Sequence, residues 1–278
     1  MLSYRHGFHA GNFADVHKHC VLVEVLDYLK RKAKPLSYID THAGGGSYDL
    51  ASDFAQKKRE FDDGIGRLWA DEGRPLARYL TCVRTFNADA ELTQYPGSPA
   101  LARMLLGAED RLILFERHRN EALSLRGWAE GDRRVTVREE DGFSGCIGLL
   151  PPPSRRGLLL MDPAYELKSD DDDVVRTLAA CHRRFGTGVY LLWYPVVDRS
   201  RTEAMLAALV ATGIRRIDRY ELGVAPDGEG FGMTASGLLV INPPFTLRST
   251  MEQVLPWLAQ RLGREGQGWS RCETLVSE

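Results

Sequence analysis

The stretch GLLLMDPAYE, residues 157–166, has the pattern of a buried strand that ends on a charged residue. Four apolar residues follow one another without polar alternation, which is typical of a strand covered on both faces in a parallel sheet. Asp162 and Pro163 end the run, because proline cannot donate a hydrogen bond to a central ladder. The stretch therefore predicts an α/β protein in which a carboxylate, a rigid turn and the ring of Tyr165 follow a core strand.

Alternating strand and helix patterns extend from this stretch in both directions. We predict strands over 36–40, 111–116, 134–138, 188–194, 216–222 and 236–242, and helices over 14–34, 99–107, 119–129, 171–183, 201–211 and 249–262. This alternation is typical of a mostly parallel sheet with helices on both faces. No clear helix separates the last two strands, so we expect an antiparallel hairpin at the sheet edge. We expect Asp15 to cap the first helix.

The composition is that of an ordinary globular chain. Its 278 residues are 44% hydrophobic and 27% charged, with a formal net charge of −2, which neither supports nor excludes a nucleic-acid partner. No apolar run reaches the roughly 20 residues of a membrane helix, and the polar N-terminus is no signal peptide. The five cysteines are scattered without a CxxC motif. We expect a cytoplasmic monomer with reduced thiols and no membrane partner.

Short basic clusters recur along the chain. They include residues 30–34, 57–59, 133–134, 155–156, 183–184 and 215–216. Paired basic residues are common on solvated surfaces, so we interpret each cluster as solvated surface in preference to a track for phosphates.

A glycine-rich loop, DTHAGGG at residues 40–46, follows the first predicted strand. Glycines there allow a tight turn and a close approach of the backbone to a ligand. A dinucleotide fingerprint needs a third glycine where Asp49 stands. The loop instead fits the first motif of S-adenosylmethionine enzymes, which puts Gly44 in a cofactor site. A glycine turn that holds no ligand is the alternative.

Acidic residues follow three further predicted strands. Glu116 ends the second, Asp141 follows the third and Asp162 ends the fourth. Because the carboxyl ends of parallel strands meet in one crevice, we expect these carboxylates to converge. Glu116 can accept both ribose hydroxyls, and Asp141 with the backbone N–H of Gly142 can bind an adenine edge. Each acid alone is also consistent with a helix cap.

Residues 162–165, DPAY, fit the [D/N]-P-P-[Y/F/W] pattern of amino-group methyltransferases, with Ala164 in place of the second proline. The amine of adenine is a poor nucleophile because its lone pair is delocalised into the ring. A carboxylate and a backbone carbonyl that accept its N–H bonds favour a pyramidal nitrogen. Pro163 fixes the turn, and we expect the ring of Tyr165 to stack on an extruded base.

A second match, NPPF at residues 242–245, fits that pattern fully. It follows the last predicted strand, whereas a catalytic copy should end the strand after Asp141. We therefore prefer Asp162 as the acceptor and expect the segment of Asn242 to close the terminal hairpin.

Four of the seven histidines lie within residues 6–19. Their spacing fits no common zinc pattern, so we predict no metal. An ordered arm with surface histidines is one alternative. We favour a cap over the active site, in which Tyr4, Arg5 and Lys18 contact the substrate and His19 lies near the cofactor.

The segments MLSYRHGFHAGNFADVHKH, YIDTHAGGGSYDL, DPAYE and GLLVINPPF resemble the RlmJ family, bacterial 23S ribosomal RNA adenine-N6 methyltransferases, and the resemblance covers essentially the whole chain. It implies a Rossmann-like class I S-adenosylmethionine-dependent methyltransferase fold, with a mostly parallel sheet and an antiparallel last strand. It also implies a helical insertion over 49–93, within a domain formed by 1–48 and 94–278 whose N-terminal arm is 1–13. The implied function is N6-methylation of an adenine in 23S ribosomal RNA.

The resemblance further implies roles for single residues. Asp162 would be the catalytic acceptor, Tyr4 would contact the RNA and Lys18 would lie near the site. The implied cofactor contacts are His19, His42, Ser98, Glu116, Asp141, Gly142 and Asp162. Two alternatives stay open: a non-catalytic RNA-binding protein of the same fold, and an amino methyltransferase acting on DNA adenine or on a glutamine amide.

Overall fold

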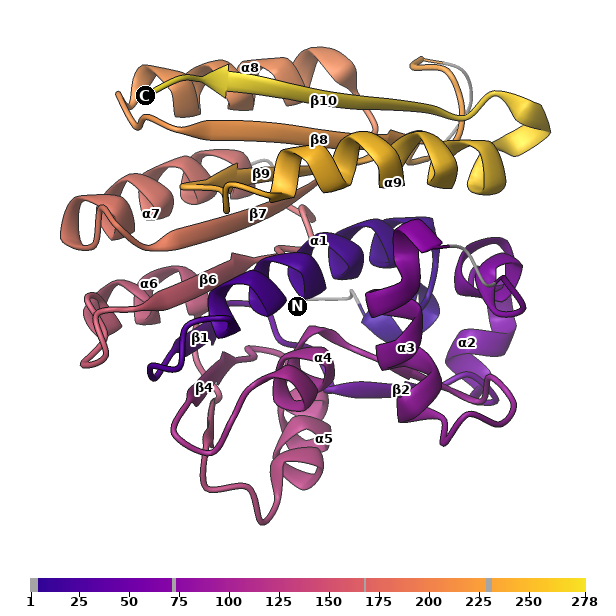
Figure 1. Cartoon of the computed structure of the whole chain (residues 1–278), viewed down its shortest axis with the longest axis horizontal. Coiled ribbons are helices and arrows are strands. Elements are labelled where there is room, and N and C mark those ends of the chain that lie inside the picture. Colours follow the sequence, from indigo (N-terminus) through magenta and orange to yellow (C-terminus); the bar gives the residue numbers. More distant parts are fainter. Residues whose placement is uncertain (1–4, 72–73, 168, 229–231) are drawn as a thin grey trace.

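A central sheet with helices on both faces organises the chain. The computed structural model describes residues 5–71, 74–167, 169–228 and 232–278. The strands of the sheet are β1 (Ser37–Asp40), β4 (Arg111–Phe115), β5 (Val135–Arg138), β6 (Gly157–Met161), β7 (Val189–Val196), β8 (Ile217–Gly223), β9 (Ala235–Ile241) and β10 (Trp269–Val276). Within the described ranges these eight strands have the order β10-β8-β9-β7-β6-β1-β4-β5 (Figure 1).

Strand direction changes only in the C-terminal part of the sheet. The strands β5, β4, β1, β6 and β7 pair in parallel. β9 runs antiparallel to both β7 and β8, and β10 runs antiparallel to β8. The predicted antiparallel pairing of the strands near 216–222 and 236–242 is therefore confirmed, but its position at the edge was wrong. The edge strand is β10, which the sequence analysis did not predict because its sequence WSRCETLV is polar and only partly buried.

Each face of the sheet has its own core. The first face packs against α1 (Phe13–Lys30), α4 (Ser98–Leu105), α5 (Arg119–Ala129) and α9 (Leu247–Leu262), and the second against α6 (Gly142–Gly145), α7 (Asp170–Arg184) and α8 (Arg199–Ala211). Successive side chains of a strand point to opposite faces, so Leu158 of β6 joins the first core and Leu159 joins the second. In the described residues, no helix is long and apolar enough to cross a membrane.

The first helix begins with a different cap from the one expected. The side chain of Asn12 accepts hydrogen bonds from the backbone N–H groups of Ala14 and Asp15, both at 3.0 Å. Asp15 lies inside the first turn and is almost fully buried, so the prediction that it caps the helix was wrong. The helix ends at Lys30, where the guanidinium of Arg156 donates to the carbonyl of Leu29 at 2.5 Å.

A small segment with its own two-stranded sheet lies beside α1. The strands β2 (Ser47–Asp49) and β3 (Gln94–Pro96) pair antiparallel, and α2 (Asp53–Lys58) and α3 (Ala77–Phe86) lie between them in the sequence. Figure 1 shows α3 against α1, and buried Tyr79 and Val83 of α3 belong to the same core as Leu22 of α1. The bounds 49–93 for an insertion subdomain stay a prediction.

Candidate functional site

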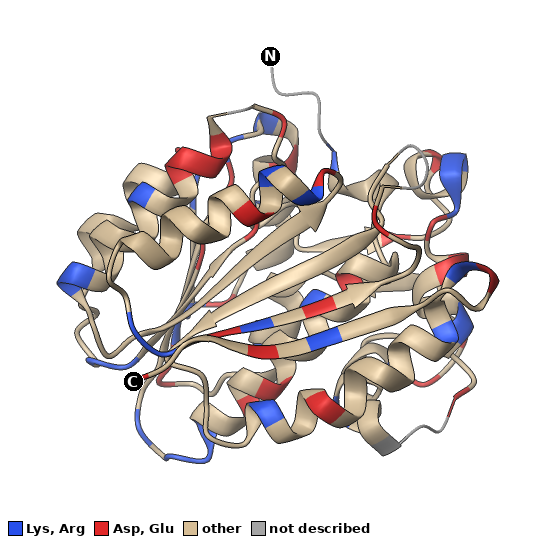
Figure 2. Ribbon diagram, turned by 90° about the horizontal axis from the view of Figure 1, so that it is seen from above, with Lys and Arg blue, Asp and Glu red and all other residues tan. Residues whose placement is uncertain are grey.

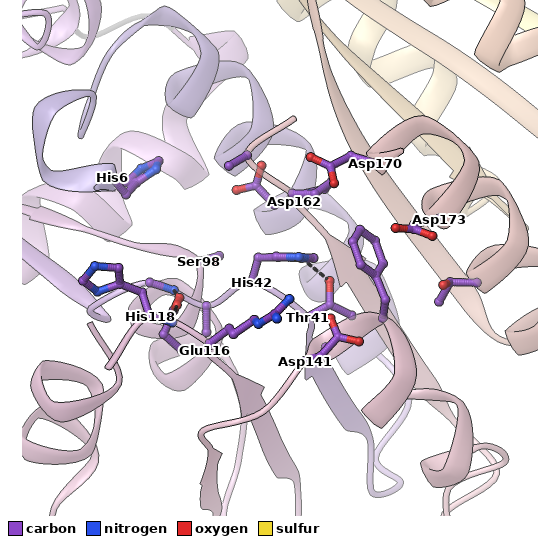
Figure 3. A pocket seen from close by; sticks show the side chains of 18 of the residues that line it. His6, Thr41, His42, Ser98, Glu116, His118, Asp141, Asp162, Asp170 and Asp173 are labelled. Carbon is purple, nitrogen blue, oxygen red and sulfur yellow. Dashed lines mark hydrogen bonds between the residues drawn. The ribbon is translucent and has the colours of Figure 1, made fainter. Parts of the chain in front are cut away.

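A cavity of about 570 Å³ opens at the carboxyl ends of the parallel strands. It contains most of the residues that the sequence analysis assigned to a site: Lys18, His19, His42, Gly44, Ser98, Glu116, Asp141, Gly142, Asp162 and Pro163. Figure 3 shows His42, Glu116, Asp141 and Asp162 around one space. The topology explains this convergence, because β1, β4, β5 and β6 are parallel neighbours whose carboxyl ends share one edge.

Two glycines let the backbone line this cavity closely. Gly44 has a φ of +61°, and a Cβ there would lie 2.1 Å from the hydroxyl of Tyr48. A Cβ on Gly142 would lie 2.0 Å from the carbonyl oxygen of Thr41. Any larger residue at either position would push the loop out of place.

Glu116 is a partly buried acid that accepts hydrogen bonds from the backbone. Its Oε2 accepts from the N–H of Gly44 at 2.9 Å, and its Oε1 accepts from the N–H of His118 at 2.6 Å. Burial raises the pKa of Glu116 to about 7, although the two backbone donors oppose the change. The carboxylate therefore joins the glycine loop to the end of β4, with its remaining lone pairs at the edge of the cavity.

Asp40, at the end of β1, holds Ser98 and was not among the predicted site residues. Its Oδ2 accepts from the hydroxyl of Tyr38 at 2.6 Å and from that of Ser98 at 2.7 Å. Burial raises the pKa of Asp40 to about 6, against these hydrogen bonds. Asp40 does not line the cavity but fixes a residue that does.

Two histidines of the cavity are held neutral by burial. Burial lowers the pKa of His42 to about 4, in spite of the nearby carboxylates of Asp162 and Asp141. Burial likewise lowers the pKa of His19 to about 3. The Nδ1 of His42 lies 2.8 Å from the hydroxyl of Thr41, as Figure 3 shows. Both rings therefore offer polar atoms without adding positive charge.

Lys18 connects two carboxylates at the floor of the site. Its Nζ lies 2.5 Å from Oδ2 of Asp162 and 2.9 Å from Oδ1 of Asp15. Burial alone would lower the pKa of Lys18, but the charges of Asp15 and Asp162 outweigh it and raise the pKa. Asp15 also accepts from the backbone N–H of Gly11 at 2.9 Å and lies 2.8 Å from the ring of His6. The buried ammonium thus ties α1 to the end of β6.

The N-terminal histidines diverge to separate partners. Each of the four histidine rings forms a hydrogen bond with a different side chain. The ring of His6 bonds to the carboxylate of Asp15, and that of His9 to the carboxylate of Glu60 at 2.8 Å. The ring of His17 bonds to the hydroxyl of Ser236 at 3.0 Å, and that of His19 to the hydroxyl of Tyr95 at 2.8 Å. Across the described ranges, no group of three or more His, Cys, Asp or Glu side chains has the arrangement of a metal site. His6, Lys18 and His19 line the cavity, which fits the idea that the start of the chain covers it.

Two predicted site residues, Tyr165 and Arg5, have contacts other than those expected, and a third, Tyr4, lies outside the described residues. The backbone of Tyr165 has a φ of +53°, and its hydroxyl donates to the carbonyl of Trp193 at 2.9 Å. Its ring consequently does not line the cavity, contrary to the expectation that it faces a base. The guanidinium of Arg5 lies 5.1 Å from the ring centre of Phe54.

Asn242 of the second motif lies at the opposite end of the sheet. It follows β9, which runs antiparallel to β7, and its Nδ2 donates to the carbonyls of Gly186 at 2.9 Å and Gly188 at 2.7 Å. It does not line the cavity. The segment leads from β9 into α9, so the expectation that it closes the hairpin was wrong.

The cavity also contains residues that the sequence analysis missed. They are His6, Thr41, His118, Phe143, Asp170 and Asp173, among others. The spacing of Asp15 and Lys18, three residues apart on a helix, was the available signal for the ion pair at the floor. Phe143 lies on α6, Asp170 and Asp173 lie on α7, and His6, Thr41 and His118 lie outside the strands and α-helices. Sequence periodicity gives no indication of which of these side chains turn toward the cavity.

Comparison with known proteins identifies the family of this chain and solved structures with a similar fold. A family model described as "Ribosomal RNA large subunit methyltransferase D, RlmJ" matches residues 33–276. The curated "Ribosomal RNA large subunit methyltransferase J" of Escherichia coli (strain K12) is 48% identical over 280 residues and is covered along its full length, as is this chain. The protein of the same name from Haemophilus influenzae is 47% identical over 281 residues, again at full coverage of both.

Two solved structures are informative. Protein LPL1258 from Legionella pneumophila matches with a TM-score of 0.89 and 37% identity, over 96% of this chain and 98% of that one. A probable spermidine synthase from Corynebacterium glutamicum matches with a TM-score of 0.51 and 12% identity, over 94% of this chain and 75% of that one. The second likeness concerns the fold alone.

Proposed function

The chain belongs to the RlmJ family of ribosomal RNA large subunit methyltransferases, and from this membership we propose that it methylates the N6 amine of an adenine in 23S ribosomal RNA, with Asp162 as the acceptor. The fold is the Rossmann-like methyltransferase fold that the sequence predicted. One observation carries the proposal: Asp162 lies in the cavity directly after β6, held by the buried ammonium of Lys18.

The lining of the cavity fits S-adenosylmethionine. Gly44 and Gly142 allow the loops that line the cavity to pack closely, because a Cβ there would clash with Tyr48 or with the backbone of Thr41. Nδ1 of His118 is buried without a hydrogen-bond partner in the described part of the chain. We propose that Glu116 accepts the ribose hydroxyls, that Asp141 and Gly142 bind the adenine edge, and that His19, His42, Gly44 and Ser98 complete the site. When bound, the cofactor supplies a methyl group on a positively charged sulfur. Neutral His19 and His42 do not repel that charge.

Asp162 and Pro163 act on the amine. The ammonium of Lys18 bonds to Oδ2 of Asp162, which leaves Oδ1 to accept an N–H of the substrate. Pro163 restricts the backbone after Asp162, so the turn holds its acceptors in one orientation. Two acceptors on one amine favour a pyramidal nitrogen, and positioning is the main contribution to transfer. Oδ1 of Asp162 can take the proton as the amine becomes cationic.

The alternatives have less support. A glutamine-amide enzyme built on Asn242 would need that side chain near the cavity, and its Nδ2 is bonded at the other end of the sheet. A non-catalytic RNA-binding protein would not need a buried Lys18 aimed at Asp162. We propose that the protein acts on ribosomal RNA as a monomer in the cytoplasm and that it needs no metal. In this proposal Tyr4, Arg5 and Lys18 lie near the RNA.

Substitution of Asp162 tests the proposal. Transfer of labelled methyl is measured on 23S ribosomal RNA from cells that lack this enzyme. We expect Asp162→Ala to lower kcat by roughly 100-fold or more, because it removes the side-chain acceptor of the amine. Asp162→Asn keeps one acceptor oxygen and should lose less activity. Affinity for S-adenosylhomocysteine should stay in Asp162→Asn and be lost in Glu116→Ala.

Asn242→Ala is the matched control for the second motif and should keep its kcat. Near-normal turnover of Asp162→Ala would refute the role of Asp162. Label that appears in DNA or protein but not in RNA would refute the substrate.

A further inference from the structure

Basic residues gather at the end of the sheet opposite the cavity. Lys32 and Lys34 precede β1, Arg155 precedes β6, Arg183 precedes β7, and Arg215 and Arg216 precede β8. These strands run in the same direction, so the segments before them lie along one edge of the sheet. Figure 2 shows blue segments on the loops around the C-terminus, at that end. We call these six residues the basic edge.

Most of this charge has no role in folding. The side chains of Lys32, Lys34, Arg155 and Arg183 are exposed and have no ion-pair or hydrogen-bond partner within the described ranges. Arg215 donates to the backbone carbonyl of Glu278 at 2.8 Å, and Arg216 lies 3.8 Å from its carboxylate.

The neighbours of two of these residues have structural roles instead. Arg156 caps α1, and Nε of Arg184 donates to the carbonyl of Leu150 at 2.9 Å. In each of these basic pairs, therefore, the second arginine supports the fold while the first stays available. The chain as a whole is slightly acidic, so the basic edge is a local concentration of positive charge.

An exposed aromatic ring lies between the loops of the basic edge. Phe245 is 92% exposed and follows Asn242 and two prolines in the turn after β9. Asn242 fixes the turn from both sides: its Nδ2 donates to the carbonyls of Gly186 and Gly188, and its backbone N–H donates to that of Arg216 at 2.9 Å. A rigid turn thus holds an aromatic ring between two basic loops.

We propose that the basic edge and Phe245 form a second RNA-binding surface, where an unpaired base stacks on Phe245 and phosphates contact the flanking arginines. Cations that follow a backbone, combined with an exposed aromatic ring, are the features that bind single-stranded nucleic acid. The chemistry favours RNA over a protein partner, because the exposed ring of Phe245 lies among exposed cations.

This inference rests on the proposed function and specifies its substrate. Arg155 and Asp162 are seven positions apart on either side of β6, about 23 Å at roughly 3.3 Å per residue. The RNA segment on the basic edge is consequently remote from the methylated base. The enzyme would recognise a folded RNA that reaches both ends of the sheet.

The test compares full-length 23S ribosomal RNA with the shortest fragment that is still methylated. The variants are the triple change Arg155→Ala, Arg183→Ala, Arg215→Ala and, separately, Phe245→Ala. We expect KM for the full-length RNA to rise roughly fivefold or more in each, as is usual for lost stacking or phosphate contacts. kcat, affinity for S-adenosylhomocysteine and KM for the fragment should stay unchanged. The triple change should also reduce the slope of log affinity against log salt by about two, at roughly 0.7 for each lost contact.

Conservative variants separate the possible causes. The triple change to Lys keeps the charge and should keep affinity. Phe245→Trp should retain affinity and Phe245→Leu should lose it, because only the first preserves stacking. Ultraviolet crosslinking should join Phe245 to RNA.

An unchanged KM and salt slope would overturn the second surface, as would a Phe245→Leu variant that binds RNA like the wild type. Wild-type protein that transfers no methyl to RNA would instead refute the proposed function.

Discussion

At the scale of single residues, burial determines the direction of the pKa shift at Glu116 but is outweighed by neighbouring charges at Lys18. At Glu116 burial dominates and raises the pKa to about 7 in spite of two backbone donors, and the charges of Glu121 and Asp40 act in the same direction as burial. At Lys18 the carboxylates of Asp15 and Asp162 outweigh burial, and the ammonium stays charged. The site therefore contains one acid, Glu116, that burial makes easier to protonate, and a second acid, Asp162, that is paired with a buried ammonium.

The raised pKa of Glu116 should make stability depend on pH. Its pKa is about 7 when folded and 4.5 ordinarily, so folded protein binds the proton more tightly. This contribution is fully present below about pH 4.5 and is lost as the pH rises through 7. Between pH 4 and pH 8 we expect the unfolding free energy of the wild type to fall by about 3 kcal/mol relative to Glu116→Gln. Urea denaturation of both across this range measures it. Asp40, whose pKa is also raised by burial, is present in both proteins, so parallel curves would contradict the prediction.

Sequence reasoning found the acids that follow strands but not their partners. Glu116 and Asp162 come directly after an apolar run and Asp141 lies three residues past the end of β5. Parallel strands bring these ends together. Lys18 and Asp162 are 144 positions apart, and no local pattern encodes that α1 crosses the end of β6 at this place. The surroundings of Tyr165 were not predictable either: its backbone has a φ of +53°, and its hydroxyl donates to the carbonyl of Trp193.

At the scale of elements, α1 connects the site to the segment between β2 and β3. Its cap, Asn12, accepts from the first turn with Oδ1 and donates to Glu60 with Nδ2 at 3.0 Å. One side chain thus fixes the start of the helix that carries Lys18 and His19.

Loss of this cap should weaken the fold measurably. Asn12→Ala removes the acceptor of two backbone N–H groups, and we expect the free energy of unfolding to fall by about 1 to 2 kcal/mol. Asn12→Ser keeps a capping oxygen and should recover most of the loss, although it cannot reach Glu60 in the same way. Chemical denaturation compares the three proteins. Equal stability of the Ala and Ser variants would mean that the cap is unimportant.

Strands with clear apolar runs were predictable, and the last strand was not. β6, β7 and β9 are buried nearly throughout and show it in sequence. β10 is half-exposed along its length, and its main anchor is Trp269, whose Nε1 donates to the carbonyl of Ala225 at 2.9 Å. β10 reaches β8 only because α9 carries the chain back along the sheet after β9, and no local sequence signal specifies this path.

At the scale of the whole molecule, the sheet separates two ends with different chemistry. The carboxyl ends of the parallel strands carry the acids of the cavity, and the opposite end carries the basic edge. Both arrangements follow from strand direction, since residues placed before and after each parallel strand are sorted to opposite ends of the sheet. The sequence contained both sets, but only the topology reveals that the basic clusters share one edge.

This separation predicts which substitutions affect cofactor binding in the intact protein. A ligand that binds only the folded state at 100 times its Kd adds about 2.7 kcal/mol of stability, which corresponds to roughly 5 °C in Tm for a chain of this size. We expect S-adenosylhomocysteine at that concentration to raise the Tm of the wild type, of Asp162→Asn and of the triple Ala variant of the basic edge by similar amounts. Glu116→Ala should show no shift, because it lacks the acceptor for the ribose. A thermal shift assay with each purified protein measures this. The prediction would be contradicted if the Tm of Glu116→Ala rose as much as that of the wild type. It would also be contradicted if the Tm of the basic-edge variant did not rise, because cofactor binding would then depend on the basic edge.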